Sequence, residues 1–299
     1  MTPDLVIVIV TYNSAHVAVP LLDSLPLALG GVAASVVVVD NGSADGTADL
    51  VSARGDCHVV RSSNTGYSAG INRGVAEFPA AQAILILNPD VILHPGSVPP
   101  LLRALSEPGV GLAAPQVRSA EGDLELSLRR EPTILRAAGL TRTRLPVFSE
   151  YVAERAAYDR PGTVDWAIGA VLAMSRHCYD TLGGWDESYF LYSEDTDIGL
   201  RARDTGLATR YVPASVATHI GGQSGRDRTT HAMQIVNRVR LYRRRHGPAA
   251  SWCYYGVSLA NELSRVPRGH SESWSAVMAL ARPGRRPACL GCSDRLVPR

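Results

Sequence analysis

Three acidic residues that lie close together in the second half of the chain could carry out chemistry. Glu194, Asp195 and Asp197 follow the aromatic-rich run 189–192. A carboxylate in a binding site can act as a general base and remove the proton of an attacking hydroxyl group. Acidic residues are also favoured in the first turn of a helix by the helix dipole. The pattern therefore leaves a catalytic and a structural interpretation open.

A glycine-hinged loop precedes these acids. Gly183 and Gly184 are followed by Trp185, Asp186 and Glu187. An aromatic side chain on such a loop offers a flat apolar face, on which a sugar ring could stack. We therefore expect this loop to border a substrate.

The first hundred residues alternate between short Val/Ile-rich runs and longer amphipathic stretches. This alternation predicts a parallel sheet covered by helices on both faces. Ligands of such sheets bind at the carboxyl ends of the strands. The predicted strands are 5–11, 35–40, 57–61 and 83–88, and the predicted helices are 15–29, 44–54 and 67–78.

Polar residues follow three of the predicted strands. Any one of these segments could be an ordinary turn, since Asn, Asp, Gly and Ser are common there. Three at successive strand ends favour a site. Asp40 could accept hydrogen bonds from a base or a ribose, with Ser43 as the N-cap of the next helix. The segments are Thr11-Tyr12-Asn13, Asp40-Asn41-Gly42-Ser43 and Asn88-Pro89-Asp90.

The segment 64–74 could bind an anion. Gly66 stands where a helix is expected to begin, and backbone N–H groups at a helix start point towards an anion. Asn72 follows within the same helix, and Arg73 adds positive charge. The same glycines could instead permit close packing of the helix on the sheet. Neither a dinucleotide fingerprint nor a P-loop motif is present.

Asp90 emerges from a strand that is otherwise apolar. A buried carboxylate is costly unless it is paired or bound to a cation. Mg²⁺ or Mn²⁺ is commonly held by one or two protein ligands and the phosphates of a substrate. His219, which precedes a glycine-rich loop, could supplement Asp90 as a ligand.

The rest of the chain predicts mixed α+β structure and then a basic extension. We expect strands at 110–115, 124–128 and 164–175, an excursion at 129–163, and helices at 194–206 and 228–245. Residues 226–299 carry fourteen arginines against four acidic residues. The domain prediction is a catalytic unit 1–225, divided into halves 1–115 and 116–225, then a helical extension 226–266 and a poorly ordered tail 267–299.

Composition excludes several classes of protein. The five cysteines are too few and too scattered for a disulfide framework. No run of apolar residues is long enough to span a membrane, and no signal peptide is recognisable. The basic charge is confined to the tail without a reading motif, which argues against nucleic acid. We expect a cytoplasmic protein.

The order of these motifs resembles family 2 glycosyltransferases of the GT-A fold, in particular the rhamnosyltransferase-like branch that builds bacterial cell-wall and O-antigen polysaccharides. Each segment is weak alone, but seven in the family's order are specific. They extend from about residue 5 to residue 225. The matching segments are 9–13, 39–47, 64–74, 87–90, 183–187, 192–195 and 219–222.

The resemblance implies a role for each candidate residue. Many relatives carry a second Asp where this chain has Asn88, which leaves one carboxylate in the metal motif. The implied roles are nucleotide-sugar binding for Thr11, Asn13, Asp40, Gly66, Asn72, Arg73 and Asn88; metal binding for Asp90 and His219; catalysis for Asp195, the general base, with Glu194; and acceptor binding for Gly184, Trp185 and Asp186.

The resemblance also implies an inverting, metal-dependent transfer. The donor would be a dTDP-, UDP- or GDP-sugar, and the acceptor a glycan or a polyprenyl-linked sugar. The basic tail, with Trp252, Tyr254 and Tyr255 after its arginines, could hold the protein on the cytoplasmic face of the inner membrane, or could be a solvated helix face. The rival functions are a nucleotidyltransferase and a nucleotide-sugar-binding module without transfer.

Overall fold

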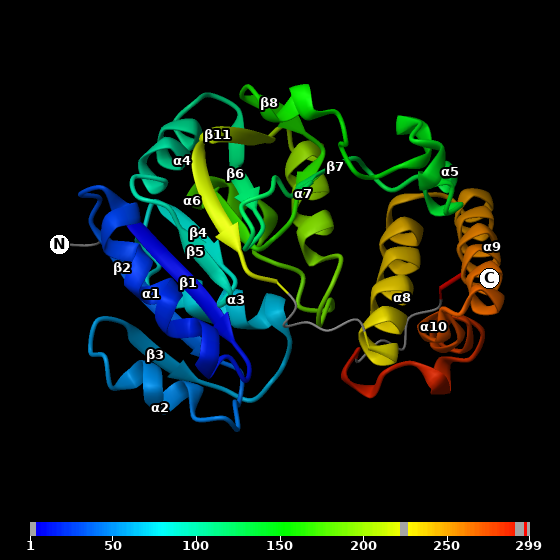
Figure 1. Cartoon of the computed structure of the whole chain (residues 1–299), viewed down its shortest axis with the longest axis horizontal. Helices are drawn as coiled ribbons and strands as arrows, with labels where there is room; N and C mark the ends of the chain where they lie inside the picture. Colours follow the sequence, from blue (N-terminus) through cyan, green and yellow to red (C-terminus); the bar gives the residue numbers. More distant parts are fainter. Residues whose placement is uncertain (1–3, 222–226, 291–295, 298–299) are drawn as a thin grey trace.

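The computed structural model describes residues 4–221, 227–290 and 296–297. A mixed sheet with helices on its two faces forms the larger part of the molecule, and a group of helices stands beside it (Figure 1). The strand order of the main sheet is β3-β2-β1-β4-β10-β6-β11-β5, with β8 paired to β11.

The first four strands are parallel, as the sequence predicts. Every residue of β1 is buried, because helices cover both faces of the sheet. Gly70 and Gly74 lie so close to valines of β1 and β2 that an added Cβ would come within 2.7 and 2.6 Å of them. These glycines therefore serve helix–sheet packing. The elements are β1 (Leu5–Thr11), α1 (Ala15–Leu29), β2 (Ala34–Asp40), α2 (Thr47–Ser52), β3 (His58–Arg61), α3 (Tyr67–Ala76) and β4 (Ala83–Leu87).

The second half of the sheet is mixed. β10 runs antiparallel between β4 and β6, and β11 pairs parallel with β6. The expected strand 164–175 is divided among three elements. Of the expected strand 124–128, only Leu128 is in a named strand, because the chain turns there into an excursion. The elements are β5 (Val91–Leu93), α4 (Val98–Leu105), β6 (Val110–Arg118), β8 (Gly162–Val164), β9 (Trp166–Ala167), β10 (Val171–Ser175), α6 (Arg176–Leu182), α7 (Glu194–Asp204) and β11 (Ala208–His219).

The excursion leaves the main body at β7 (Leu128–Arg129), which pairs antiparallel with β9. It contains short helical segments and no long element. It extends towards α9 (Pro248–Arg265), on which its first helix packs (Figure 1). Its segments are α5 (Ile134–Ala137), η1 (Thr141–Thr143), η2 (Pro146–Phe148) and η3 (Arg155–Tyr158).

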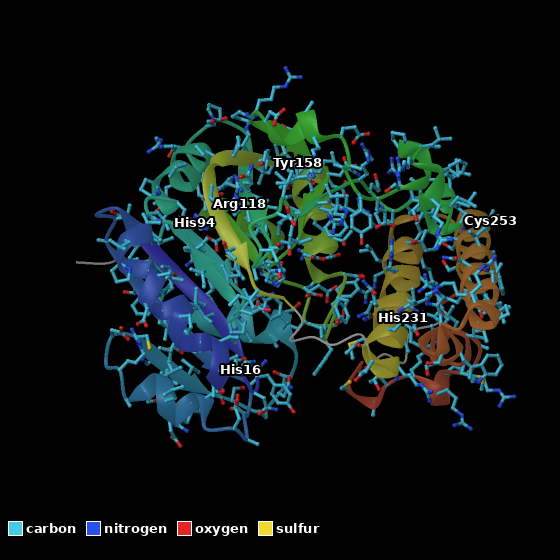
Figure 2. The ribbon with its side chains drawn as sticks, viewed as in Figure 1. His16, His94, Arg118, Tyr158, His231 and Cys253 are labelled. Atoms are coloured by element: carbon cyan, nitrogen blue, oxygen red, sulfur yellow. The ribbon has the colours of Figure 1, made fainter. Side chains whose placement is uncertain are left out.

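The helical extension has its own hydrophobic core. α8 (Arg228–Arg245) begins at Asp227, whose side chain forms a capping box with Thr230, and it matches the predicted helix. His231 of α8 bonds to the buried Glu262 of α9, with 2.8 Å between Nε2 and Oε2 (Figure 2). The remaining elements are η4 (Val266–Arg268), α10 (Ser271–Ala281), η5 (Pro283–Arg285) and η6 (Ala288–Leu290).

The expectation of a poorly ordered tail from residue 267 is wrong for α10. This helix packs against α8 and α9 and buries Ala276, Ala279 and Leu280. Small apolar residues at helical spacing, which lie among the Arg and Pro residues of the tail, indicate this helix in the sequence. No helix in the described ranges is long and apolar enough to cross a bilayer.

Candidate functional site

The ends of β1 and β2 are linked by their own side chains. Asp40 is 3% exposed, and its Oδ1 accepts a hydrogen bond from Oγ1 of Thr11 at 3.0 Å. Its Oδ2 accepts from the backbone N–H of Ser43 at 3.0 Å. Ser43 is therefore not a helix N-cap, because α2 begins only at Thr47, after Gly46. The carboxylate holds the strand-end loop in shape.

Asn13 continues this arrangement. Its backbone is left-handed, with φ +52°, and its N–H donates to Oγ of Ser43 at 2.9 Å. Its Oδ1 accepts from the N–H of Ala44 at 2.8 Å. The loops after β1 and β2 are thus tied into one polar rim.

Arg73 lies beside the same rim. Its guanidinium bonds to Oγ of Ser62, whose backbone N–H in turn donates to the carbonyl oxygen of Asp40 at 2.9 Å. Thr11, Asn13 and Asp40 therefore share one edge of the sheet, as the strand ends predict, and Arg73 reaches the same edge from α3.

Gly66 and Asn72 have other tasks. A Cβ at Gly66 would lie 2.7 Å from the carbonyl oxygen of Phe190, to which the N–H of Tyr67 donates at 2.7 Å. The side chain of Asn72 bonds to the backbone of Trp185 and to Tyr179 and Glu187. The interpretation of Asn72 as a nucleotide ligand is not supported, because its polar atoms hold the 179–187 region in place.

The loop 183–187 is a structural loop. Trp185 is 2% exposed and belongs to the hydrophobic core, so its ring has no face for a sugar. Asp186 bonds to Arg244 of α8 at 2.7 Å, and the carbonyl oxygen of Gly184 accepts from Arg201. The expectation that Gly184, Trp185 and Asp186 border the acceptor is therefore not supported by their contacts.

Tyr67 brings the candidate catalytic and metal residues together. Its hydroxyl donates to Oδ1 of Asn88 at 2.7 Å. Burial raises the pKa of Tyr67 well above its usual value, and the charges of Glu194, Asp90 and Asp195 raise it further. Interactions of this kind act over short distances. The three carboxylates therefore lie near one phenol.

Asp195 is held as a hydrogen-bond acceptor. Its Oδ2 accepts from the N–H of Gly169 at 3.3 Å and its Oδ1 from the N–H of Thr196 at 2.7 Å. Burial raises the pKa of Asp195, while these two N–H groups and the positive charge of Arg129 oppose that rise. A carboxyl group with a raised pKa is a stronger base for an alcohol proton.

Glu194 differs from its neighbour. It is 7% exposed, and its Oε2 has no hydrogen-bond partner among the described residues. Burial raises the pKa of Glu194 well above its usual value, and the charge of Asp195 adds to that effect. Asp195 is less buried than Glu194, so Asp195 is the more accessible of the two carboxylates.

The turn before α7 is strained. Tyr192 and Ser193 both have left-handed backbones, with φ +69° and +74°. Non-glycine residues adopt this conformation only where their surroundings enforce it. Nδ2 of Asn237, in α8, donates to the carbonyl oxygens of Leu191 and Tyr192 at 3.0 and 3.1 Å. The extension therefore supports the turn that presents Asp195.

Asp90 and His219 form a pair that fits a divalent cation. Nε2 of His219 lies 3.4 Å from Oδ1 of Asp90, and its Nδ1 lies 3.5 Å from Oε2 of Glu125. Two neighbouring ligands of one metal stand roughly 3 Å apart, and a carboxylate often orients the far nitrogen of a ligating histidine. Burial acts to lower the pKa of His219, but Asp90 and Glu125 outweigh it and raise it.

The pair is small for a metal site. No group of three or more His, Cys, Asp or Glu that could hold a metal occurs in the described ranges. A cation there would need substrate phosphates as further ligands, as is usual for Mg²⁺. The glycine-rich loop expected after His219 falls at 222–226, outside the described residues.

Sequence reasoning missed four residues of the site. Tyr67 was hidden within the glycine motif, and Gly169 within an expected strand. Arg129 and Asn237 had no local signal, because they reach the site from the excursion and from α8. Only the fold brings them together.

The fold has known counterparts. A mannosyltransferase from Pyrobaculum calidifontis, solved with GDP-mannose and Mn²⁺, superposes with a TM-score of 0.56 over 99% of this chain and 84% of its own, at 15% identity. GalNAc-T7, solved with UDP, GalNAc and Mn²⁺, gives a TM-score of 0.59 at 16% identity, over 80% of this chain and 47% of its own. The fold is that of a GT-A glycosyltransferase.

Sequence comparison gives the family. The model for glycosyl transferase family 2 matches residues 6–162. A Mycobacterium tuberculosis protein named N-acetylglucosaminyl-diphospho-decaprenol L-rhamnosyltransferase is 34% identical over 251 residues, covering 77% of this chain and 81% of its own. The chain therefore belongs to glycosyl transferase family 2, and the resemblance to its rhamnosyltransferase-like branch is confirmed.

More distant relatives are also named as sugar transferases. The low-salt glycan biosynthesis hexosyltransferase Agl10 of Haloferax volcanii is 29% identical over 68% of this chain and 62% of its own. Rhamnosyltransferase WbbL of Escherichia coli is 25% identical over 48% of this chain and 54% of its own.

Proposed function

We propose that this glycosyltransferase moves a sugar, most simply L-rhamnose, from a nucleoside-diphosphate donor to a hydroxyl group of a polyprenyl-diphosphate-linked sugar. The M. tuberculosis relative is named for the transfer of L-rhamnose to a decaprenyl-diphosphate-linked sugar, which supports this donor sugar and this acceptor class. The nucleotide is a dTDP, UDP or GDP group. The reaction takes place on the cytoplasmic face of the membrane that carries the acceptor.

The observation that carries the proposal is the convergence of Asp90, Asn88 and Asp195 around the hydroxyl of Tyr67. A metal motif and a proton acceptor beside one another are what a single displacement at an anomeric carbon requires. Of the two adjacent carboxylates, Asp195 is the more accessible and Glu194 the more buried, which supports Asp195 as the single proton acceptor.

The mechanism follows from this arrangement. Asp195 removes the proton of the acceptor hydroxyl while the oxygen of that hydroxyl attacks the anomeric carbon. The nucleoside diphosphate leaves from the opposite face. One displacement inverts the anomeric configuration. The N–H groups of Gly169 and Thr196 fix the orientation of the Asp195 carboxylate.

Asp90 and His219 would hold the cation, Mg²⁺ or Mn²⁺, together with the donor diphosphate. When bound, the cation would neutralise the charge that develops on the leaving group. Thr11, Asn13, Asp40 and Arg73 form the rim for the nucleoside, and the side chain of Asn88 is held by the hydroxyl of Tyr67.

The decisive experiment is transfer by Asp195→Asn. We expect at least about a thousandfold loss of kcat with unchanged binding of nucleoside diphosphate and Mn²⁺ by calorimetry, because only the proton acceptor is removed. Product analysis by NMR should show inversion. Unchanged transfer by Asp195→Asn would exclude Asp195 as the base, and nucleotide binding without any transfer by the wild type would instead favour a binding module. Absence of metal-dependent binding of UDP, dTDP and GDP to the wild type would overturn the donor site.

A further inference from the structure

The excursion carries an exposed surface that is both apolar and basic. All residues from 139 to 147 are exposed, including Leu140 and Leu145 at 46% and 53%. No acidic residue lies between Glu131 and Glu150, whereas arginines stand at 142 and 144. Exposed leucines beside unopposed arginines are unusual on a surface that faces only water.

The outward side of α9 is also apolar. Trp252 is 51% exposed and Leu263 is 46% exposed, and Gly256 and Ala260 lie exposed between them at helical spacing. Glu262 is the one charged residue from 248 to 264, and it is 2% exposed and bonded to His231. From residue 248 to residue 264, the outer side of α9 therefore presents no charge, and Arg265 at its end is paired with Glu272.

These two surfaces adjoin. Nδ2 of Asn261, in α9, donates to the carbonyl oxygen of Ala137 at 3.2 Å. A Cβ at Gly139 would lie 2.2 Å from Oδ1 of the same Asn261, so the excursion lies directly on α9. Both elements stand at the end of the molecule away from the sheet, and Cys253 marks the outer edge of α9 (Figures 1 and 2).

The base of the excursion lies beside the catalytic carboxylate. The N–H of Arg130 donates to the carbonyl oxygen of Glu150 at 2.7 Å, so the outgoing and returning segments of the excursion are bonded together at its base. Arg129, one residue earlier, is close enough for its charge to act on Asp195. A surface formed by the excursion is thus connected through two short chain segments to the site of proton removal.

We propose that residues 139–147 and the exposed residues of α9, here called the membrane face, rest on an anionic lipid bilayer. Leucines and Trp252 enter the interface, and Arg142 and Arg144 bind lipid phosphates. The inference rests on the proposed function, since a lipid-linked acceptor must reach Asp195 from a membrane. A two-fold contact between copies would bring these arginines towards each other without an acidic partner.

The arginines of α8, which the sequence suggested for this task, are largely engaged within the protein. Arg240 is 4% exposed and donates to the carbonyl oxygen of Ser188, Arg244 bonds to Asp186, and Arg245 to Asp204. The membrane face therefore lies on α9 and the excursion.

The test is sedimentation of the full chain with vesicles of phosphatidylcholine that contain about one-third phosphatidylglycerol. Arg142→Gln with Arg144→Gln should lower the partition coefficient roughly twenty- to thirtyfold, because each arginine near an anionic surface contributes about fivefold. Leu140→Ser with Leu145→Ser should lower it similarly. Leu27→Ser with Arg103→Gln, on α1 and α4, is the matched control and should bind as the wild type does.

Fluorescence gives a second measurement. In a Trp274→Phe background, Trp252 is the exposed tryptophan, since Trp166 and Trp185 are buried. Its emission should shift to shorter wavelength with anionic vesicles and stay unchanged with vesicles of phosphatidylcholine alone. A wild-type protein that fails to sediment with anionic vesicles, or that dimerises through Leu140 and Leu145, overturns the membrane face.

The outcome is separable from that of the proposed function. Transfer to a water-soluble acceptor with a short alkyl chain uses Asp195 and does not need the bilayer. The variants of the membrane face should retain that transfer and lose transfer to acceptor in vesicles. Loss of vesicle binding without any difference between the two acceptors would contradict the inference while leaving the glycosyltransferase reaction intact.

Discussion

At the ends of β1 and β2, the candidate donor residues bond mainly to one another, whereas the candidate catalytic residues depend on distant segments. Asp40 is held by Thr11 and Ser43, all within the first half of the sheet. Asp195 is supported by Gly169, and its preceding turn by Asn237 of α8. The proposed donor rim (Thr11, Asn13, Asp40 and Arg73) is held by residues of the first half of the sheet. The proposed catalytic turn (residues 191–195) is held by segments far away in the chain.

Among the variants that separate the two regions, Asn237→Leu should have the largest effect on kcat. It removes both hydrogen bonds that support the strained turn at 191–193, so Asp195 loses its position. We expect kcat to fall by about ten- to a hundredfold, since small misplacements of a catalytic group are costly. Donor binding should change little. Gln234→Ala, one turn earlier on α8, is the control, and equal losses in both variants would contradict a role for Asn237.

Asp40→Asn tests the donor rim. The amide group cannot accept from Ser43 and Thr11 in the way that the carboxylate does. Hydrogen bonds to a charged group contribute about 1.5–3 kcal/mol each to stability, so the loops that form the rim become less ordered and we expect donor Kd to rise about tenfold with kcat nearly unchanged. Calorimetry measures the donor Kd, and kinetics at saturating donor measure kcat. Asp49→Asn, at an exposed carboxylate on α2, should alter neither.

Arg129→Gln tests the electrostatics of the catalytic turn through pH. The positive charge of Arg129 opposes the rise in the pKa of Asp195, so its removal raises that pKa further. A base acts in its ionised form, and the acidic limb of kcat/KM should therefore move to higher pH. Arg130→Gln is the control. A limb that moves to lower pH would exclude Asp195 as the titrating base.

Glu194→Gln should produce the smallest effect, a gain in stability. Because the pKa of Glu194 is raised in the folded protein, folding becomes less favourable as pH rises above the pKa of the unfolded carboxyl. The neutral amide removes this penalty, so Tm at pH 8 should rise by about 2–4 °C. The gain should vanish as pH falls below the pKa of the unfolded carboxyl, about 4. An unchanged Tm at pH 8 would contradict a raised pKa of Glu194 in the folded protein.

The contrast between the two regions also explains what could be read from the sequence. The parallel strands were predicted because hydrophobic patterning is local, and α7 because its acids and late arginines are local too. Thr11, Asn13 and Asp40 were predicted to lie together because strand ends meet at one edge of a parallel sheet.

Trp185 and Asn72 were misread for a physical reason. An aromatic residue on a glycine loop looks the same in sequence whether it faces a ligand or the core. Here α3 and α7 both pack near that loop, so Asn72 holds its backbone and Trp185 fills the interior. The burial of a loop depends on elements far away in the chain, and no pattern within the loop reports it.

Two glycines of this chain should tolerate substitution to different degrees during evolution. Gly46 and Gly66 both have positive φ, +82° and +104°. Nothing lies within 4 Å of a Cβ at Gly46, so a residue that tolerates left-handed backbone, such as asparagine, could replace it during divergence. At Gly66 the backbone of Phe190 fills that space. Any lineage that keeps the contact between α3 and the turn before α7 must therefore keep this glycine.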